Sequence, residues 1–302
     1  MPTFVAGQVE VSVPATSANL GPGFDSLGLA LDFRDRVTAT VIDSGLEITI
    51  SGVGEGEVPL DENHLVYKAM CRAFAQMDCV VPGIRFHCEN VIPHARGLGS
   101  SSAAIVAGIC AARGLVAGGS LLMDDDAVFN LAADMEGHPD NVAPAFFGGF
   151  TIAYSVQDRS FAKVVFVDPR VNVVVFVPPE PVETKVARGL LPDTVSHATA
   201  AANSGRAALL VAALSQQPEL LFAATEDLLH QNYREPAMPE TLRFVHALRA
   251  DGVAAVVSGA GPTVLAFADS SERPGVQARV PDGWQVLALP IDRKGAQISV
   301  GG

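Results

Sequence analysis

Apolar and polar residues alternate along several short stretches near the start of the chain. Residues 9–13 (VEVSV), 37–42 and 46–50 each show this period of two, and a short polar segment, residues 43–45, separates the last two. Because successive side chains of a strand point to opposite faces, the pattern predicts antiparallel strands in this region.

Longer stretches follow in which apolar residues recur at helical spacing. They predict helices over residues 65–77, 101–116 and 125–135, the last opened by acidic residues that suit a helix N-terminus. Further along, the patterns predict strands over 150–156, 163–167 and 171–177, helices over 198–214 and 239–251, and strands over 253–257, 263–268 and 286–290. Strands and helices mix without regular βαβ repetition, so we expect an α+β fold, with one domain over residues 1–155 and a second over 156–302.

Composition narrows the class of protein. With 302 residues, 49% of them hydrophobic, the chain can form one large or two medium domains. The formal net charge of the chain is −13 at pH 7. Proteins that bind nucleic acid or a membrane surface usually have a basic surface, so we expect neither as a partner. The start does not resemble a signal peptide, and we expect a cytoplasmic protein. The four cysteines form no CxxC pair, which favours reduced, buried thiols.

Residues 92–104 (IPHARGLGSSSAA) place Gly97, Gly99 and three serines at the start of a helix-forming run. Glycine permits close approach of an anion to the backbone, and the free amides of a first helical turn favour a phosphate group. For this string alone, an ordinary Ser-capped helix is about as good an interpretation as a nucleotide site. No lysine is followed by Ser or Thr, which excludes a Walker A motif, and no GxGxxG follows a strand.

Residues 93–103 resemble the signature phosphate loop of the GHMP kinases. Residues 14–25 (PATSANLGPGFD) and 258–266 (SGAGPTVLA) resemble the other motifs of that family, while 138–149 (HPDNVAPAFFGG) and SANLGPGFD resemble its homoserine kinase branch. The four motifs occur in the family's order over nearly the full chain. The resemblance implies a two-domain GHMP kinase fold, in which an N-terminal, nucleotide-binding domain similar to domain 2 of ribosomal protein S5 precedes a ferredoxin-like C-terminal domain.

The resemblance also implies an activity: ATP- and Mg²⁺-dependent phosphorylation of the side-chain hydroxyl of L-homoserine, in threonine biosynthesis, by a homodimer. Asn63 would contact the adenine end of ATP, although an Asn that caps the next helix explains this residue equally well. The remaining ATP contacts that the resemblance implies are Pro93, His94, Ala95, Arg96, Gly97, Leu98, Gly99, Ser100, Ser101, Ser102 and Ala103.

Substrate contacts are implied in the same way. Asn19 and Asp25 would hold the hydroxyl and ammonium ends of the amino acid, whereas the residues alone fit a plain surface loop. Arg188, in a TKVAR segment, and Arg234, in an NYRE segment, would clamp the substrate carboxylate, with Thr184 as a weaker contact. Without the resemblance, either arginine is more simply explained as a structural or solvated residue.

For the chemical step, the resemblance implies Ser101 and Glu136 as Mg²⁺ ligands, and Asn141, Arg188 and Ser101 as catalytic residues. Oxygen ligands of this kind suit Mg²⁺. An Asn cannot accept a proton at neutral pH, so we expect catalysis by alignment of the hydroxyl with the γ-phosphate and by neutralisation of charge. Asp140 is adjacent, and the hypothesis is that it is not a general base.

Three other interpretations stay open. A GHMP kinase for a different alcohol would leave Arg188 and Arg234 without purpose if that substrate lacked a carboxylate. A catalytically dead ligand sensor on the same fold conflicts with intact Ser101 and Glu136. A purely structural protein leaves the four motifs unexplained. Among the seven histidines, His138 lies in the HPDN motif and His94 in the phosphate loop, the others are interpreted as surface or helix-end residues, and none is expected to be a catalyst.

Overall fold

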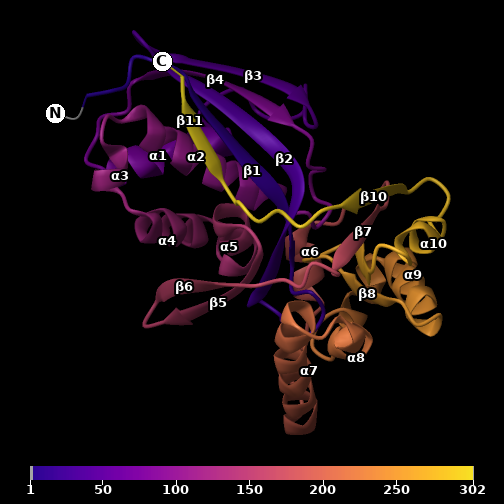
Figure 1. Cartoon of the computed structure of the whole chain (residues 1–302). Helices are drawn as coiled ribbons and strands as arrows, with labels where there is room; N and C mark the ends of the chain where they lie inside the picture. Colours follow the sequence, from indigo (N-terminus) through magenta and orange to yellow (C-terminus); the bar gives the residue numbers. More distant parts are fainter. Residues whose placement is uncertain (1–2, 302) are drawn as a thin grey trace.

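A computed structural model of the chain describes residues 3–301, which fold around two β-sheets (Figure 1). The first sheet has seven strands in the order β11-β1-β2-β4-β3, with β5 paired to β2 and β6 paired to β5, and the second has the order β10-β7-β9-β8. The strands are β1 (Val9–Ala18), β2 (Leu27–Ile42), β3 (Leu46–Gly52), β4 (Gly83–Asn90), β5 (Phe150–Val156), β6 (Arg159–Val165), β7 (Asn172–Val177), β8 (Ala254–Val257), β9 (Val264–Ala268), β10 (Gln285–Leu289) and β11 (Gln297–Val300).

Helices cover both sheets. They are α1 (Leu65–Gln76), α2 (Ser100–Leu115), α3 (Gly119–Leu122), α4 (Asp125–Glu136), α5 (Pro139–Phe147), α6 (Thr184–Gly189), α7 (His197–Ser215), α8 (Leu221–Ala224), α9 (Pro239–Ala250) and α10 (Arg273–Gln277), with 3-10 turns η1 (Pro218–Leu220) and η2 (Asn232–Ala237). No helix within residues 3–301 combines the length and the apolar composition that a membrane crossing requires.

The strand pairings confirm the α+β expectation, because every pair in the described range is antiparallel except β3 with β4. The strands predicted at 37–42 and 46–50 exist and run antiparallel, but they do not pair with each other. Strand β4, which the patterns missed, lies between them. Its buried Ile84, Phe86 and Cys88 alternate with more exposed positions and give the sheet a continuous apolar row.

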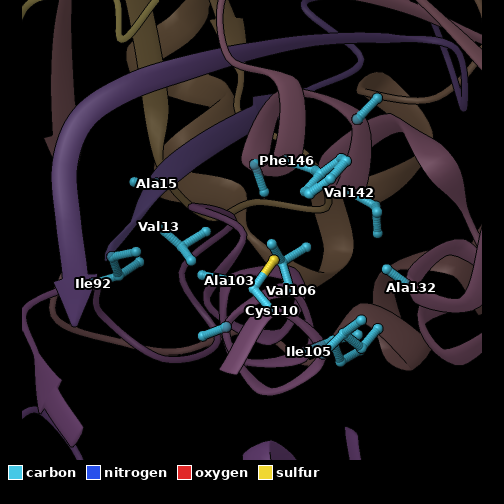
Figure 2. Packing of buried hydrophobic residues seen from close by; sticks show 14 of the residues in the cluster. Val13, Ala15, Ile92, Ala103, Ile105, Val106, Cys110, Ala132, Val142 and Phe146 are labelled. Carbon is cyan, nitrogen blue, oxygen red and sulfur yellow. The ribbon is translucent and has the colours of Figure 1, made fainter. Parts of the chain in front are cut away.

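Helix α2 lies at the centre of the first core (Figure 2). Its side chains Ala103, Val106 and Cys110 are fully buried and belong to one cluster with Val13 of β1 and Val142 of α5. A helix that is apolar on nearly all sides must be enclosed, and the small Ala and Gly residues of α2 let β1, α1, α4 and α5 pack closely around it. This packing fixes where the N-terminus of α2 points.

The second sheet is buried on both faces. Along β7, Val173, Val175 and Val177 belong to the first hydrophobic cluster, whereas Val174 and Phe176 belong to a second cluster. The first cluster also includes residues of α7 and α8, and the second includes residues of α9 and α10. Because neighbouring residues of a strand face opposite ways, β7 joins two layers of helices through one sheet.

The predicted domain division at residues 1–155 and 156–302 stays a prediction. Two strands from the second half, β6 and β11, belong to the first sheet, since β6 pairs with β5 and β11 pairs with β1. Strand β1 also extends beyond its predicted end at residue 13. It continues past a bulge between Pro14 and Ala15 as far as Ala18. The four cysteines are free thiols, as predicted, although Cys71 is only partly buried.

Candidate active site

One open cavity gathers most of the side chains that the sequence singled out. With its mouth included, it encloses about 640 Å³ of empty space, a size typical of small-molecule sites. Its walls come from the end of β1, the loop before α2, the junction of α4 and α5, and the segments around α6, η2 and the 258–262 turn. The lining residues are Ala18, Asn19, Ala95, Gly97, Gly99, Ser100, Ser101, Glu136, His138, Asp140, Asn141, Thr184, Arg188, Arg234, Gly259 and Ala260.

The predicted phosphate loop reaches this cavity at the N-terminus of α2. Gly97 and Gly99 have φ values of 75° and 71°, in the left-handed region that favours glycine. A Cβ atom on Gly97 would lie 2.3 Å from the carbonyl oxygen of Ser258, and one on Gly99 would lie 1.9 Å from Oγ1 of Thr16. Gly99 caps α2 without any side-chain hydrogen bond, so the first amides of the helix remain available to an anion.

The 258–262 turn holds this loop in place. The Ser258 hydroxyl lies 2.6 Å from the carbonyl oxygen of Gly97 and 2.8 Å from the Ser17 hydroxyl. Since a carbonyl oxygen can only accept, Ser258 donates to Gly97 and accepts from Ser17. Arg96 binds the other side of the loop to the end of β7, where its guanidinium donates to the carbonyl oxygens of Pro178 and Pro179.

Ser101 and Glu136 meet where α2 begins and α4 ends. The Ser101 hydroxyl donates to Oε2 of Glu136 at 2.8 Å. Burial raises the pKa of the Glu136 carboxyl, and the hydrogen bond from Ser101 acts in the opposite direction. The neighbouring Ser102 is fully buried. Its hydroxyl is near enough to lower the pKa of Glu136 as well, but it forms no hydrogen bond of good geometry. The donor set is therefore a carboxylate and hydroxyls beside free helix amides, which suits a cation that is shared with phosphate oxygens.

Asn141 is oriented by a residue of β1. The Thr16 hydroxyl, which is fully buried, donates to Oδ1 of Asn141 at 2.8 Å. Because this hydrogen bond occupies Oδ1, the amide NH₂ of Asn141, a residue that lines the cavity, is free to donate. Asn141 can thus donate to a bound hydroxyl oxygen.

Asn19 organises the loop after β1. Its Nδ2 donates to the carbonyl oxygen of Gly259 at 2.9 Å, and its Oδ1 accepts from the backbone amide of Asp25 at 3.0 Å. Both Asn19 and Asp25 have positive φ values, 68° and 54°, which non-glycine residues adopt at an energetic cost. The hydrogen bonds of Asn19 hold this strained loop against the 258–262 turn.

Asp25 and Arg188 form a two-pronged ion pair. The two terminal nitrogens of Arg188 lie 2.6 and 3.1 Å from the two carboxylate oxygens of Asp25. The Arg188 Nε is buried and has no partner, and its guanidinium also lies over the Phe24 ring, 5.5 Å from the centroid. The two residues that were expected to hold opposite ends of a zwitterion therefore lie side by side.

Arg234 is a buried cation without an acidic partner. It is only 1% exposed, and within residues 3–301 it forms no ion pair. Its guanidinium donates to the Gly259 carbonyl oxygen and to Nδ1 of His230, so His230 carries its proton on Nε2, which donates to the Gly21 carbonyl oxygen. Burial, and then the charge of Arg188, lower the pKa of Arg234 to about 10.

Unpartnered polar atoms concentrate at this cavity. Within the described part of the chain, six buried side-chain atoms lack a hydrogen-bond partner, and the residues that carry them are Ser102, His138, Asp140, Arg188, Arg234 and Thr263. Four of these residues line the cavity. Buried polar groups are normally paired, so this concentration indicates a site whose partners are supplied by ligands.

Some predicted ATP contacts lie outside the cavity. Asn63 is exposed, and His64 rather than Asn63 caps α1 by accepting from the Val66 amide. Pro93 and His94 line a neighbouring groove together with Arg96. Three further predicted contacts, Leu98, Ser102 and Ala103, are fully buried and do not line the cavity. Each assignment as an ATP contact stays a prediction.

Sequence reasoning missed three residues of this site: Thr16, Phe24 and His230. His230 was interpreted as a surface or helix-end residue, which is wrong, because it is fully buried and stacks on Phe24 with centroids 5.2 Å apart. His230 lies in a bend just before the 3-10 turn η2 that carries Arg234, so their contact depends on this local chain path and no helical spacing predicts it. Thr16 gave no signal either, because its role depends on a contact across 125 positions.

Comparisons with known proteins agree with this geometry. Family models match over residues 64–149, as the GHMP kinases N terminal domain, and over residues 206–285, as GHMP kinases C terminal. A homoserine kinase of Streptomyces coelicolor is 52% identical over 299 residues, which cover 98% of this chain and 96% of the relative.

Solved structures give the same result. The crystal structure of homoserine kinase from Cytophaga hutchinsonii superposes with a TM-score of 0.82 at 27% identity, covering 97% of this chain and 98% of that one. A putative homoserine kinase from Listeria monocytogenes gives a TM-score of 0.77 at 32% identity, covering 97% of this chain and 100% of that one. The two-domain GHMP kinase fold expected from the motifs is confirmed.

Proposed function

The chain belongs to the GHMP kinase family, and on that premise we propose that it is a homoserine kinase, which transfers the γ-phosphoryl group of ATP to the side-chain hydroxyl of L-homoserine. The product, O-phospho-L-homoserine, lies on the route to threonine. The observation that carries the substrate assignment is Arg234, a buried guanidinium without an acidic partner, which lines the same cavity as the phosphate loop. A substrate carboxylate would complete its pairing.

The amino-acid end of the substrate would lie against Arg234, Arg188 and Asp25. Burying a charge without a partner costs free energy, so a ligand that pairs with that charge gains binding free energy. Thr184, the first residue of α6, lines the cavity beside Arg188 and is available for a further hydrogen bond. The arrangement favours a substrate with both a carboxylate and an ammonium group over a neutral alcohol.

The phosphate end of ATP would lie at the N-terminus of α2. Free amides of the first helical turn, with the positive end of the helix dipole, stabilise phosphate oxygens there. Ser100 and the glycine-lined loop border the same part of the cavity. The reacting hydroxyl would approach from the side of α5, where Asn141 offers its amide NH₂.

Ser101 and Glu136 are the groups that would hold Mg²⁺. Among residues 3–301 no cluster of three acidic, His or Cys side chains forms a metal site of its own, so phosphate oxygens and water would complete the coordination. When bound, the ion would neutralise charge that develops on the transferring phosphoryl group. The unpartnered hydroxyl of Ser102 fits a role in the same anion site.

We propose catalysis by alignment, without a protein base at Asn141: the hydroxyl oxygen bonds to the γ-phosphorus as the bond to ADP breaks, and the hydroxyl proton passes to an oxygen of the transferring phosphoryl group. Thr16 fixes the amide so that Asn141 donates to the hydroxyl oxygen and holds it in line with the γ-phosphate. Arg188 lines the same cavity, and its guanidinium, although paired with Asp25, adds positive charge to the site in which the phosphoryl group is transferred. Asp140 lies one residue before Asn141, and the charges that act on it, those of Asp25 and Arg188, belong to the amino-acid end.

An assay of ADP release with Mg-ATP and a set of candidate alcohols tests the proposal. The set comprises L-homoserine, L-serine, L-threonine, mevalonate and galactose. Selective turnover of L-homoserine is the expected result. Turnover of another alcohol would keep the kinase fold but refute the substrate, and ATP binding without turnover of any alcohol would favour a ligand sensor. A homodimer stays a prediction, which light scattering on a sizing column measures.

A further inference from the structure

Arg234 is held to the protein through a single nitrogen of its guanidinium. Nη1 donates to Nδ1 of His230 at 3.1 Å and to the carbonyl oxygen of Gly259 at 2.9 Å, which occupies both of its N–H groups. Nε is buried without a partner, and within residues 3–301 Nη2 forms no hydrogen bond either. The edge left free, Nε with Nη2, presents two parallel N–H groups that match the two oxygens of a carboxylate.

His230 accepts from Arg234 in one tautomer only. Its Nε2 lies 2.8 Å from the carbonyl oxygen of Gly21, which can only accept, so Nε2 carries the proton and Nδ1 is the acceptor. The Asp227 carboxylate also lies 3.5 Å from Nε2. Burial lowers the pKa of His230, with the charge of Asp227 opposing and that of Arg234 assisting this effect. A neutral ring is what an acceptor for a guanidinium requires.

The chain around His230 fixes where its ring lies. The residue is fully buried, and the ring stacks on Phe24 with centroids 5.2 Å apart and planes 28° from parallel. The Asp227 carboxylate accepts from the backbone amides of Leu229, His230 and Gln231, which holds the bend that carries the ring. The position of Nδ1 is therefore determined by packing and by backbone hydrogen bonds.

The same contacts connect Arg234 to the loop after β1. The Gly259 carbonyl oxygen accepts from Asn19 as well as from Arg234, at 2.9 Å in both cases. His230 accepts from Arg234 and donates to Gly21, which lies in that loop. These hydrogen bonds close a ring through the five residues, so the guanidinium and the loop that carries Asn19 are held as one unit.

We propose that His230 is a positioning residue for the substrate carboxylate: it fixes Nη1 of Arg234, so that the free edge of Nε and Nη2 binds the carboxylate with two parallel hydrogen bonds. This inference rests on the proposed function and gives His230 no contact with the substrate. Without an acceptor at Nδ1, one N–H group of Nη1 would be buried and unpaired. The guanidinium would then rotate to share its other N–H groups with the protein, and the edge that matches a carboxylate would be lost.

Two substitutions separate the two contacts of His230. Asn has an oxygen close to the place of Nδ1, so His230→Asn keeps an acceptor for Arg234 and loses the donor to Gly21. Gln has an amide nitrogen close to the place of Nε2, so His230→Gln keeps that donor and loses the acceptor. His230→Leu removes both contacts and is a second variant whose apolar side chain suits a buried position. His197→Gln, at an exposed histidine that begins α7, is the matched control.

The KM for L-homoserine, the KM for ATP and kcat are measured for wild type and each variant. We expect His230→Gln to raise the KM for L-homoserine about tenfold, with the KM for ATP unchanged and kcat within about threefold of wild type. His230→Leu should raise the KM for L-homoserine at least as much. His230→Asn should stay within about threefold of the wild-type KM, because the acceptor is retained. Combined with Arg234→Met, His230→Gln should have no further effect on this KM, since it acts through that guanidinium.

Other outcomes overturn the inference. Equal KM values for L-homoserine in His230→Asn and His230→Gln, or a KM that rises for ATP as well, would show that His230 supports the fold and does not orient Arg234. An effect of His230→Gln that persists beside Arg234→Met would assign it to the loop after β1. Failure of the wild-type enzyme to turn over L-homoserine would refute the proposed function, whereas normal turnover without this pattern among the variants would refute the inference alone.

Discussion

The guanidinium of Arg188 holds both carboxylate oxygens of Asp25, across 163 positions of the chain. The pair joins α6 to the loop after β1, so it fixes one wall of the cavity. The side chains are 33% and 38% exposed, and ion pairs at that exposure contribute little to stability. The main effect of the ion pair is therefore to position Arg188 near Arg234, the cation that has no acidic partner.

Arg234→Met tests the carboxylate site. Loss of the guanidinium should raise the KM for L-homoserine by about 10- to 150-fold, because a charge-assisted hydrogen bond contributes roughly 1.5–3 kcal/mol. The free energy of unfolding should change little, because removal of a buried cation without an acidic partner offsets the loss of its hydrogen bonds to Gly259 and His230. Steady-state kinetics and thermal melts measure the two effects.

Arg243→Met is the matched control for that variant, because Arg243 is an exposed arginine in α9. Arg243→Met should change neither the KM for L-homoserine nor the free energy of unfolding. An unchanged KM in Arg234→Met would contradict the carboxylate assignment.

Gly99→Ala tests the close packing of the phosphate loop. The new Cβ would lie 1.9 Å from Oγ1 of Thr16, so the loop, the Thr16–Asn141 hydrogen bond, or both must move. We expect ATP affinity to fall at least tenfold and kcat by a larger factor, since misplacement of about 1 Å can reduce rates a hundredfold.

Gly118→Ala separates packing from backbone strain. Gly118 has a φ of 73°, close to the 71° of Gly99, but a Cβ there would meet nothing nearer than 4.0 Å. It should lose a little stability and keep full activity. Similar loss of activity in both variants would show that the contact with Thr16 is unimportant.

Asp140→Asn should change how stability depends on pH. The folded-state pKa of Asp140 is raised from 3.8 to about 7, so the folded protein binds a proton that the unfolded chain releases between those values. The stabilisation that this carboxyl gives is complete below pH 4 and is lost as pH rises to about 7. The variant should therefore melt at a similar temperature to wild type near pH 4, and several degrees higher at pH 8.

Comparison of wild type with Asp140→Asn isolates the effect of Asp140 from the effects of other acids. One of these is Asp35, whose pKa burial also raises, to about 6. Melting curves from pH 4 to pH 8 provide the measurement. A variant that melts below wild type at pH 8 would mean that the charged form of Asp140 is stabilised in the fold.

Glu136→Gln tests the proposed magnesium site. Gln can keep the hydrogen bond from Ser101, so the fold should persist, while the loss of a charged ligand should raise the Mg²⁺ concentration for half-maximal activity about tenfold. Titration of Mg²⁺ at saturating ATP and L-homoserine measures it. Asp134→Asn, an exposed acid on the same helix, should leave the titration unchanged, and an unchanged titration in Glu136→Gln would refute the assignment.

The local patterns identified most of the secondary structure. The helices at 65–77, 101–116, 125–135, 198–214 and 239–251 all exist with ends within one residue of those predicted, because each has a clear apolar stripe or composition and a definite stop. The patterns missed β4, β11, α5, the first part of β2, and the short helices α3, α6, α8 and α10. Strand β11 is short and partly exposed, and α5 begins in a motif whose Pro, Asp and Asn residues are typical of turns.

The sequence by itself determined the phosphate loop, the family and the set of candidate residues, because motifs of glycine, serine and charged residues are local and keep their order along the chain. Only the tertiary structure decided how those residues act together. It paired Asp25 with Arg188, left Arg234 without an acidic partner and Oδ1 of Asp140 without a hydrogen bond, and oriented Asn141 through Thr16. Pairing and burial depend on contacts between distant segments, and no local pattern records which charge meets which in the folded chain.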